Sequence, residues 1–585
     1  MKELTLHELI IKNGRIVDGT GRDIFFTDIA VNNGRISHIG KSEIEAVLEI
    51  DAQGMVVAPG FIDIHSHGDV SAPYYRYMQS SLMQGVTTLV GGQCGYMPAP
   101  CDRYWTSQFI EMECLQKFAD ELGVIPELGL PESMAPLIKE RFGVDFDWRD
   151  FAGYVRKLRV QGIGVNIMAF AGHGAIRSQV LDYDYKRPAI DTEISAMNEY
   201  LEEAMAAGAC GMSVGFDYAP GMYADRHEIL KLLATVKRYG GIFATHWRRT
   251  GERTANASRR SRIDGIVEAL ELAAEAEVQL QISHLMTGYE IYPSDNDVLS
   301  VCSADETLAM IDAYRKRGLT VYHDVIPNIT GGILLAPDLG MPFLKQMLEC
   351  GSRGAFAEKL HDVSYLEALK KNVTTGSIYD VNPLIDPEWD ARCTILSCKF
   401  DDYYKRSLRD ISAELDMDSV SGLLTLLRED PYTKVFRPMQ GVTPSNIKRL
   451  ISDTHATIGT DSFSIDLTTR FPFAEDMPLY YPNPNTYSGM FHYLLEYPEM
   501  RLESTIHKLT GLAASIMHLS DRGILACGNR ADIVIFDPQK LELNESLTDP
   551  RRYPVGIEHV IVNGTAAVCF GEPMLTLSGK FIERC

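Results

Sequence analysis

Eight short apolar stretches recur along the middle of this chain, and amphipathic segments separate most of them. Gly or a polar residue bounds each stretch, as is typical of buried strands. The predicted strands span residues 60–67, 85–95, 164–172, 208–217, 240–248, 278–285, 319–327 and 454–461. Segments 191–207 and 304–317 place apolar residues three and four apart, which is the period of a helix. This alternation predicts an α/β fold, a parallel (β/α)8 barrel of the TIM type.

The two ends of the chain share a different pattern. Short apolar runs flank Asn-Gly pairs at 13–14 and 33–34, and the same device returns at 563–564. Such pairs favour tight hairpin turns. The sequence therefore predicts that residues 1–58 and 519–585 form one small β-sandwich, with the barrel domain at 59–518; two unrelated caps are the alternative.

A long interval separates the seventh and eighth predicted strands. Residues 340–453 are mostly helical in pattern, at 365–371, 407–414 and 419–429. An interval of this length is typical of an insertion. The sequence leaves open whether it is a lid over the barrel mouth or a peripheral helical unit.

Composition excludes several classes of function. The 585 residues carry 56 Lys plus Arg against 79 Asp plus Glu, a net charge of −23. Such a chain repels nucleic acid and anionic membrane surfaces, and no apolar run approaches the ~18 residues of a membrane span. The 11 cysteines are scattered and odd in number, which indicates reduced thiols and a cytoplasmic location. The oligomeric state, a homo-oligomer included, stays open.

The ends of the predicted strands carry the residues of chemical interest. His65 and His67 end the first strand and face the same side, although an HxH pair alone is a weak signal. The second, fifth, sixth and eighth strands end near Cys94, His246, His284 and Asp461. The carboxyl ends of parallel barrel strands meet at one mouth. Thiolate, imidazole and carboxylate groups gathered there predict a zinc site.

These residues lie in motifs that resemble a known family. The segment Gly60–His67 resembles the opening of the amidohydrolase superfamily. The whole set, in order along the chain, resembles the N-acyl-D-amino-acid deacylase (D-aminoacylase) family. Its members here are Gln93-Cys94-Gly95, Gly172-His173-Gly174, Ser213–Gly221, His246-x-Arg248, Ser283-His284-Leu285, Gly459-Thr460-Asp461, Asp521-Arg522-Gly523 and Ala531–Pro538.

The resemblance implies how the ligands divide. Cys94, His246 and His284 would hold a tight zinc ion, and three ligands with an open fourth position suit a catalytic zinc. His65, His67 and Asp461 would lie at a second, weaker metal position, with Cys94 able to bridge. Asp461 would take a proton from water and pass it to the leaving amine; its alternative role is a helix N-cap.

The third and fourth predicted strands contain no lysine. This absence argues against the carboxylated-lysine centre of the hydantoinase and dihydroorotase type.

Three further motif residues are candidates for substrate binding, each with a plain alternative. Tyr218 would donate a hydrogen bond to a developing oxyanion, or pack at the rim. His173 would line the pocket, or be an ordinary buried histidine. Arg248 would grip a carboxylate, or pair with an acidic residue at the mouth.

Two positions depart from the family pattern. Met286 stands where the resemblance expects a lysine, and Asn328 where it expects a tyrosine. Both family residues grip the substrate carboxylate, and losing such a contact costs ~1.5–3 kcal/mol. We therefore expect weak activity on N-acyl-D-amino acids with a free carboxylate.

The sequence thus predicts a zinc-dependent enzyme that hydrolyses the linear amide bond of a small molecule. Hydrolysis of a cyclic amide, such as a hydantoin or lactam, is the alternative. A catalytically inactive scaffold is the third interpretation.

Overall fold

The structure is a computed structural model. It describes residues 6–41, 45–73, 75–100, 139–140, 145, 147–249, 262–329, 350, 353–375, 387–431, 433–436, 438, 440–467, 484–544 and 551–584. Among these residues, no helix is both long enough and apolar enough to cross a membrane.

Parallel strands form the centre of the molecule in two sheets. One has three strands and the other six, in the orders β6-β7-β8 and β9-β10-β11-β12-β13-β16. The strands are β6 (Phe61–Asp63), β7 (Val86–Gly91), β8 (Asn166–Ala169), β9 (Ala171–Gly172), β10 (Gly211–Gly215), β11 (Ile242–His246), β12 (Gln279–Ile282), β13 (Val321–Val325) and β16 (Ala456–Ile458). The predicted α/β class is confirmed, and each strand lies within its expected range.

Backbone hydrogen bonds link the two sheets at both junctions. At the first, Phe170 separates β8 from β9 and donates to the carbonyl oxygen of Gly91 at 3.0 Å. At the second, Asp461 N–H donates to the carbonyl of His65 at 2.9 Å, and His67 N–H to that of Ser462 at 2.8 Å. The ends of β6 and β16 are therefore held together beyond their last strand residues.

Helices follow most of these strands, and the apolar faces of most of them pack into a large shared core. They are α6 (Phe151–Gln161), α7 (His173–Leu181), α8 (Asp191–Ala206), α9 (Arg226–Arg238), α10 (Arg262–Ala276), α11 (Asp297–Arg315), α17 (Pro444–Ile451), α18 (Asn485–Glu496), α19 (Leu502–Leu509) and α20 (Gly511–Ile516). The helices expected at 191–207 and 304–317 correspond to α8 and α11.

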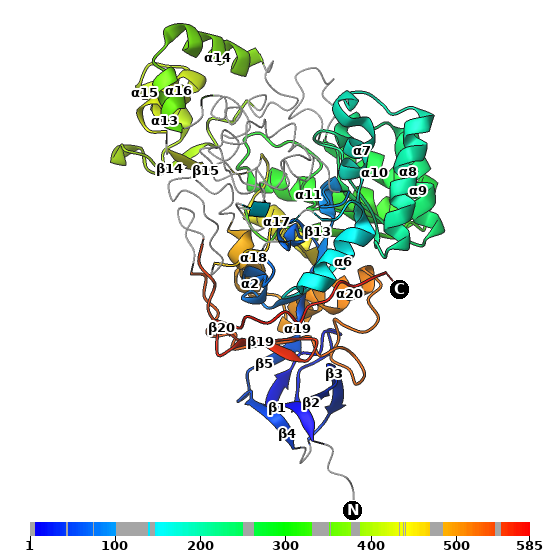
Figure 1. The fold of residues 1–585 in the computed structure, drawn as a ribbon. Coiled ribbons are helices and arrows are strands. Elements are labelled where there is room, and N and C mark those ends of the chain that lie inside the picture. The colour runs from blue at the N-terminus through cyan, green and yellow to red at the C-terminus, as the bar shows by residue number, and fades with distance from the viewer. Residues whose placement is uncertain are drawn as a thin grey trace, which may run out of the picture.

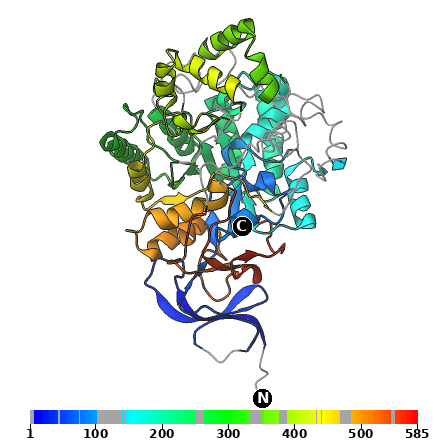
Figure 2. The same ribbon diagram turned by 90° about the vertical axis from the view of Figure 1, so that its left-hand side faces the viewer.

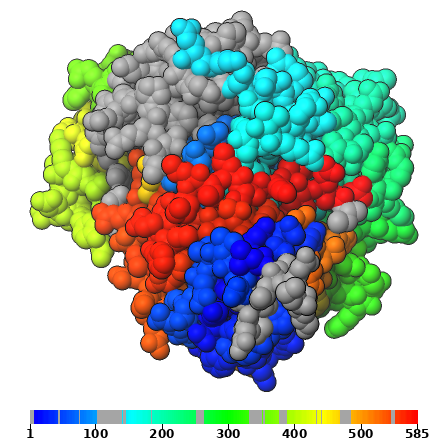
Figure 3. Space-filling model, turned by 60° about the horizontal axis from the view of Figure 1, so that its bottom comes forward, coloured from blue at the N-terminus to red at the C-terminus, as the bar shows by residue number. Residues whose placement is uncertain are grey.

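Both ends of the chain enter one nine-stranded sheet (Figures 1 and 2). Its path runs β20-β19-β18-β17-β5-β1-β2-β3, with β4 paired to β1. The strands are β1 (His7–Ile16), β2 (Phe25–Asn32), β3 (Arg35–Ile39), β4 (Ala46–Asp51), β5 (Val56–Pro59), β17 (Ile533–Phe536), β18 (Ile557–Val562), β19 (Thr565–Cys569) and β20 (Glu572–Pro573). The space-filling view shows the two chain ends adjoining on the lower face (Figure 3).

The long interval before β16 contains a separate small unit (upper left in Figure 1). It comprises α13 (Arg353–Lys359), α14 (Val363–Thr375), α15 (Leu408–Glu414), α16 (Ser419–Glu429) and the hairpin of β14 (Thr394–Ser397) with β15 (Lys434–Phe436). Its apolar side chains form their own buried cluster. The three predicted helices fall in α14, α15 and α16, whereas the hairpin was not expected. Residues 340–349 and 376–386 of the predicted insertion lie outside the described residues.

Candidate metal centre

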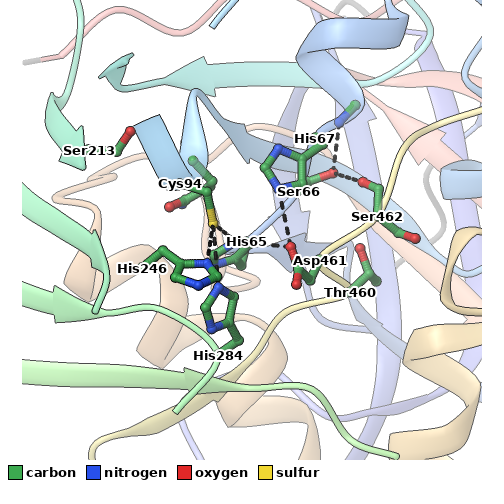
Figure 4. Close-up of polar contacts among 12 residues, drawn as sticks. His65, Ser66, His67, Cys94, Ser213, His246, His284, Thr460, Asp461 and Ser462 are labelled. Carbon is green, nitrogen blue, oxygen red and sulfur yellow. Dashed lines mark hydrogen bonds and ion pairs between the residues drawn. The ribbon is translucent and has the colours of Figure 1, made fainter. Parts of the chain in front are cut away.

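The predicted ligands converge at the carboxyl ends of the parallel strands (Figure 4). His246 is the last residue of β11, whereas His65 and His284 lie two residues beyond β6 and β12. Asp461 lies three residues beyond β16, and Cys94 sits in the short 3-10 turn Gln93–Gly95 after β7. Strand order therefore brings together residues that are up to 396 positions apart in sequence.

The sulfur of Cys94 lies at the centre of one group. It is 3.3 Å from Nε2 of His65, 3.4 Å from Nε2 of His284 and 3.7 Å from Nδ1 of His246. Ligand atoms around a tetrahedral zinc ion with ordinary Zn–N and Zn–S bonds lie about 3.5 Å apart. A soft thiolate among imidazoles, at these separations, fits zinc.

A carboxylate oxygen forms a second centre beside the first. Asp461 Oδ1 lies 3.3 Å from Nε2 of His65 and 3.1 Å from Nε2 of His67. One ligand atom from each of His65, Cys94, His284 and Asp461 lies within 4.8 Å of the others. His65 is thus common to both groups, so the cluster can hold one ion or two adjacent ions.

Left-handed backbone aims three of these side chains. The φ angles of Cys94, His284 and Asp461 are 58°, 33° and 50°. Such conformations cost of order 1–3 kcal/mol for residues other than glycine and concentrate at functional sites. Each of these three residues lies in a sharp turn just beyond the end of a strand, and the turns direct the three side chains toward one another.

The cluster strongly perturbs its own ionisation. Burial raises the pKa of the Cys94 thiol, but the charges of His65 and His284 outweigh it and hold the pKa well below its usual range. The pKa of Asp461 is likewise well below normal, because the same two histidines outweigh burial. Burial lowers the pKa of His67, but hydrogen bonding to Asp461 and Cys94 raises it to about 10. The thiolate and carboxylate forms that bind metal are therefore favoured.

Two buried aspartates that sequence reasoning left without a role support the ligands. Asp324 Oδ1 lies 3.1 Å from Nδ1 of His65 and accepts the backbone N–H of His284 at 2.7 Å. Asp63 accepts hydrogen bonds from the backbone N–H and hydroxyl group of Thr460, next to Asp461. Their positions at strand ends were the available signal, because carboxylates behind metal-binding imidazoles are a common arrangement.

A third aspartate lies behind His246. Asp217 Oδ2 is 3.5 Å from Nε2 of His246. The same carboxylate accepts from the backbone N–H and Nε of Arg249, at 2.9 and 3.1 Å. Burial lowers the pKa of His246, and the positive charge of Arg249 lowers it further. The lowered pKa favours the neutral imidazole, which is the form that binds metal.

Tyr218 lies at the cluster, but its hydroxyl has another use. It donates to the backbone carbonyl of Cys94 at 2.6 Å, and its ring stacks on Tyr96 with centroids 5.2 Å apart. This geometry supports the Cys94 turn and differs from the expected oxyanion contact.

Two other predicted binding residues lie elsewhere than expected. Nε2 of His173 is 2.8 Å from Oε1 of Glu228, in a fully buried cluster completed by Arg177. The guanidinium group of Arg248 pairs with Glu268 at 2.9 Å and donates to the carbonyl of Met222. Both follow the plain alternatives, because each finds a buried or half-buried carboxylate partner away from the pocket.

A cavity of about 140 Å³ opens beside the predicted metal ligands His246, His284 and Asp461. Met286 and Asn328 line it, as expected from the departures in sequence. Arg249 lines it as well, which sequence reasoning did not predict. The alternation of a strand would turn Arg249 away, but β11 ends at His246 and the chain changes direction.

Comparison with known proteins agrees with this geometry. Residues 48–258 and 393–568 match the model of the amidohydrolase family. The D-aminoacylase of Alcaligenes xylosoxydans xylosoxydans is 27% identical over 95% of this chain and 93% of its own. The N-acyl-D-aspartate deacylase of the same organism is 28% identical over 95% and 91%. A crystal structure of D-aminoacylase superposes with a TM-score of 0.69 at 25% identity, covering 99% of this chain and 100% of that one.

Proposed function

Because the chain belongs to the amidohydrolase family and acts on carbon–nitrogen bonds other than peptide bonds, we propose that it hydrolyses a linear amide with the help of zinc. The proposal depends on one observation above all, the three imidazole nitrogens within 3.7 Å of the Cys94 sulfur. Cys94, His246 and His284 would hold the tight ion. His65, His67 and Asp461 would form the second, weaker position.

When bound, zinc polarises a carbonyl group and lowers the pKa of water to about 7. Asp461 is the residue placed to handle protons. Its Oδ1 atom faces the cluster, and the side chain also lines the cavity. It accepts a proton from the attacking water and returns it to the departing amine.

The residues that line the cavity determine which substrate the site accepts. Met286 and Asn328 replace the lysine and tyrosine of the family pattern, so we propose that its usual carboxylate grip has departed at these positions. The more apolar wall also suits a cyclic amide, which we keep as the second candidate. The presence of all six predicted ligands in one site favours either activity over an inactive scaffold.

The same proposal includes the architecture. The link between β16 and β6 supports one closed (β/α)8 barrel spanning 59–518. Apolar side chains from both chain ends share one buried cluster, which supports a composite β-sandwich of 1–58 and 519–585. The strands of this part, among the described residues, form a single nine-stranded sheet. The separate core of the inserted unit agrees with either a lid or a peripheral role.

The cellular setting is also proposed. No disulfide bond joins two of the described cysteines, which supports the expected cytoplasmic location. A homo-oligomer stays a prediction.

Metal analysis combined with a substrate screen tests the proposal. The purified protein should contain zinc and release amine from N-acyl amino acids faster than it opens hydantoins or lactams. Cys94→Ala should remove the tight zinc, with Cys210→Ala, another buried free thiol, as the matched control. Full zinc occupancy in Cys94→Ala would refute the ligand assignment, and faster ring opening would favour the cyclic amide.

A further inference from the structure

We propose that Arg249 binds an anionic group of the substrate, a carboxylate, and thereby selects acidic amides. The inference rests on the proposed amide hydrolysis and specifies its substrate class. It departs from the weak activity on free carboxylates expected from the sequence. That expectation required that no cation replace the missing lysine near Met286.

The position of Arg249 supplies such a cation. Its Nη1 atom lies 3.3 Å from the sulfur of Met286, at the wall where the family pattern expects the lysine. Arg249 is only 3% exposed, yet it lines the cavity together with His246, His284 and Asp461. Among the described residues that line this cavity, it is the one Lys or Arg side chain.

Asp217 holds the guanidinium group in a fixed orientation. It accepts from the backbone N–H and from Nε of Arg249, so the ion pair engages the inner edge of the group. Nη2 contacts Nε2 of His246, and Nη1 faces the thioether of Met286, which is a weak acceptor. A carboxylate oxygen accepts a charge-assisted hydrogen bond from Nη1 far better than a thioether does.

The surrounding charge also favours an anion. Arg262 is buried, and burial followed by the positive charge of Arg249 lowers its pKa to about 10. A ligand carboxylate beside Arg249 would relieve this repulsion between two buried cations.

The other residues that line the cavity indicate the chemistry of the rest of the substrate. The other lining residues include Leu285, Val325, Val442, Ile447 and Leu450, all apolar. The volume of about 140 Å³ is close to the ~150 Å³ of an apolar cavity that binds benzene. The cavity therefore matches the size of one medium-sized apolar side chain of the amide substrate.

The test compares a charged substrate with its neutral counterpart. For the zinc-loaded wild type we expect N-acetyl-leucine, in its preferred enantiomer, to have a kcat/KM at least ~10-fold above that of N-acetyl-leucinamide. A charge-assisted contact of ~1.5–3 kcal/mol corresponds to ~10–100-fold. Arg249→Met should reduce the acid-to-amide ratio by that factor, mainly through KM for the acid, and Arg249→Lys should keep part of it.

Arg248→Met is the matched control, because the neighbouring guanidinium group binds Glu268 outside the cavity. Its acid-to-amide ratio should equal that of the wild type. Zinc content is measured for every variant. Equal losses on both substrates in Arg249→Met would show that Arg249 acts only through Asp217 and His246, and would overturn the proposal.

The wild type alone also decides the matter if Arg249→Met does not fold. A ratio near one for active wild type overturns the role of Arg249 but leaves amide hydrolysis intact. Failure of the zinc-loaded wild type to hydrolyse either compound overturns both proposals.

Discussion

In the proposed reaction, the carboxylate of Asp461 both accepts the proton of the attacking water and returns it to the amine. Asp461→Asn keeps the shape of the side chain but removes a base that accepts protons at neutral pH. We expect kcat and kcat/KM to fall together by ~10²–10⁴-fold. Because Asp461 Oδ1 contacts His65 and His67 but not the other cluster histidines, zinc at Cys94 should remain. Steady-state kinetics with zinc analysis check this, and near-normal kcat in a zinc-replete variant would contradict the role as base.

Asp324 acts one step further from the substrate. Asp324→Asn removes a charge that orients His65 and braces the turn of His284. Replacing such a supporting carboxylate typically costs ~10–100-fold in metal affinity. Competition with a chelator measures the affinity. Asp532→Asn, at a buried aspartate of the terminal sheet that pairs with Arg522, is the control and should leave zinc affinity unchanged.

At the scale of single residues, the sequence could predict where a side chain lies wherever the order of the strands alone determines it. The convergence of the six candidate ligands could be predicted because each stands at or just beyond the carboxyl end of a strand. Strand alternation directs Arg248 toward the site and Arg249 away from it, whereas the structure has the reverse, because β11 ends at His246. Asp324 was visible in the seventh strand, but its role emerged only from contacts with two histidines far away in sequence.

Among the elements, the turn after β7 places the central thiolate. Gly92 has φ +65°, and a Cβ atom there would lie 2.1 Å from the backbone carbonyl oxygen of Phe170. Gly92→Ala must therefore shift the turn, and we expect loss of the tight zinc and of activity. Gly240→Ala is the matched control, since φ is +64° but no atom lies within 4 Å of its Cβ. Zinc analysis of both variants checks this, and a zinc-replete Gly92→Ala would show that the turn tolerates the shift.

Helices and strands could largely be predicted where the apolar residues follow a single period, either that of a helix or that of a strand. Strands β10 to β13 and helix α8 follow their apolar patterns closely. The β14–β15 hairpin was missed, because its strands have only four and three residues and lie within a mostly helical segment. Strands this short contain too few alternations of apolar and polar residues to be distinguished from the helical segments beside them.

Across the whole molecule, polar side chains near the C-terminal end of the chain connect the terminal sheet to the central parallel strands. Asn563 donates to Asn166 of β8 at 2.7 Å, and Asp532 accepts from the same Asn166 at 3.2 Å. The paired Asn-Gly turns predicted that the ends would meet. They could not predict this polar contact with β8, since it joins residues almost 400 positions apart.

Lys508 of α19 gives the whole molecule an expected pH dependence of stability. Its ammonium group donates to the carbonyl oxygens of Asp453 and Ala456 at the start of β16. Burial lowers the pKa of Lys508 from 10.5 to about 8, against the opposing charge of Asp453. Between these two values the unfolded chain binds more protons than the folded one, so stability rises with pH across this window.

The matched pair of wild type and Lys508→Met isolates this effect from other alkaline titrations. The free energy of unfolding of wild type relative to Lys508→Met should increase by up to about 3 kcal/mol between pH 8 and pH 10.5. Urea unfolding at several pH values measures the difference. Lys540→Met, at an exposed lysine, should track the wild type throughout. A constant difference between wild type and Lys508→Met would mean that Lys508 stays protonated in the folded state, with the carbonyl contacts offsetting its burial.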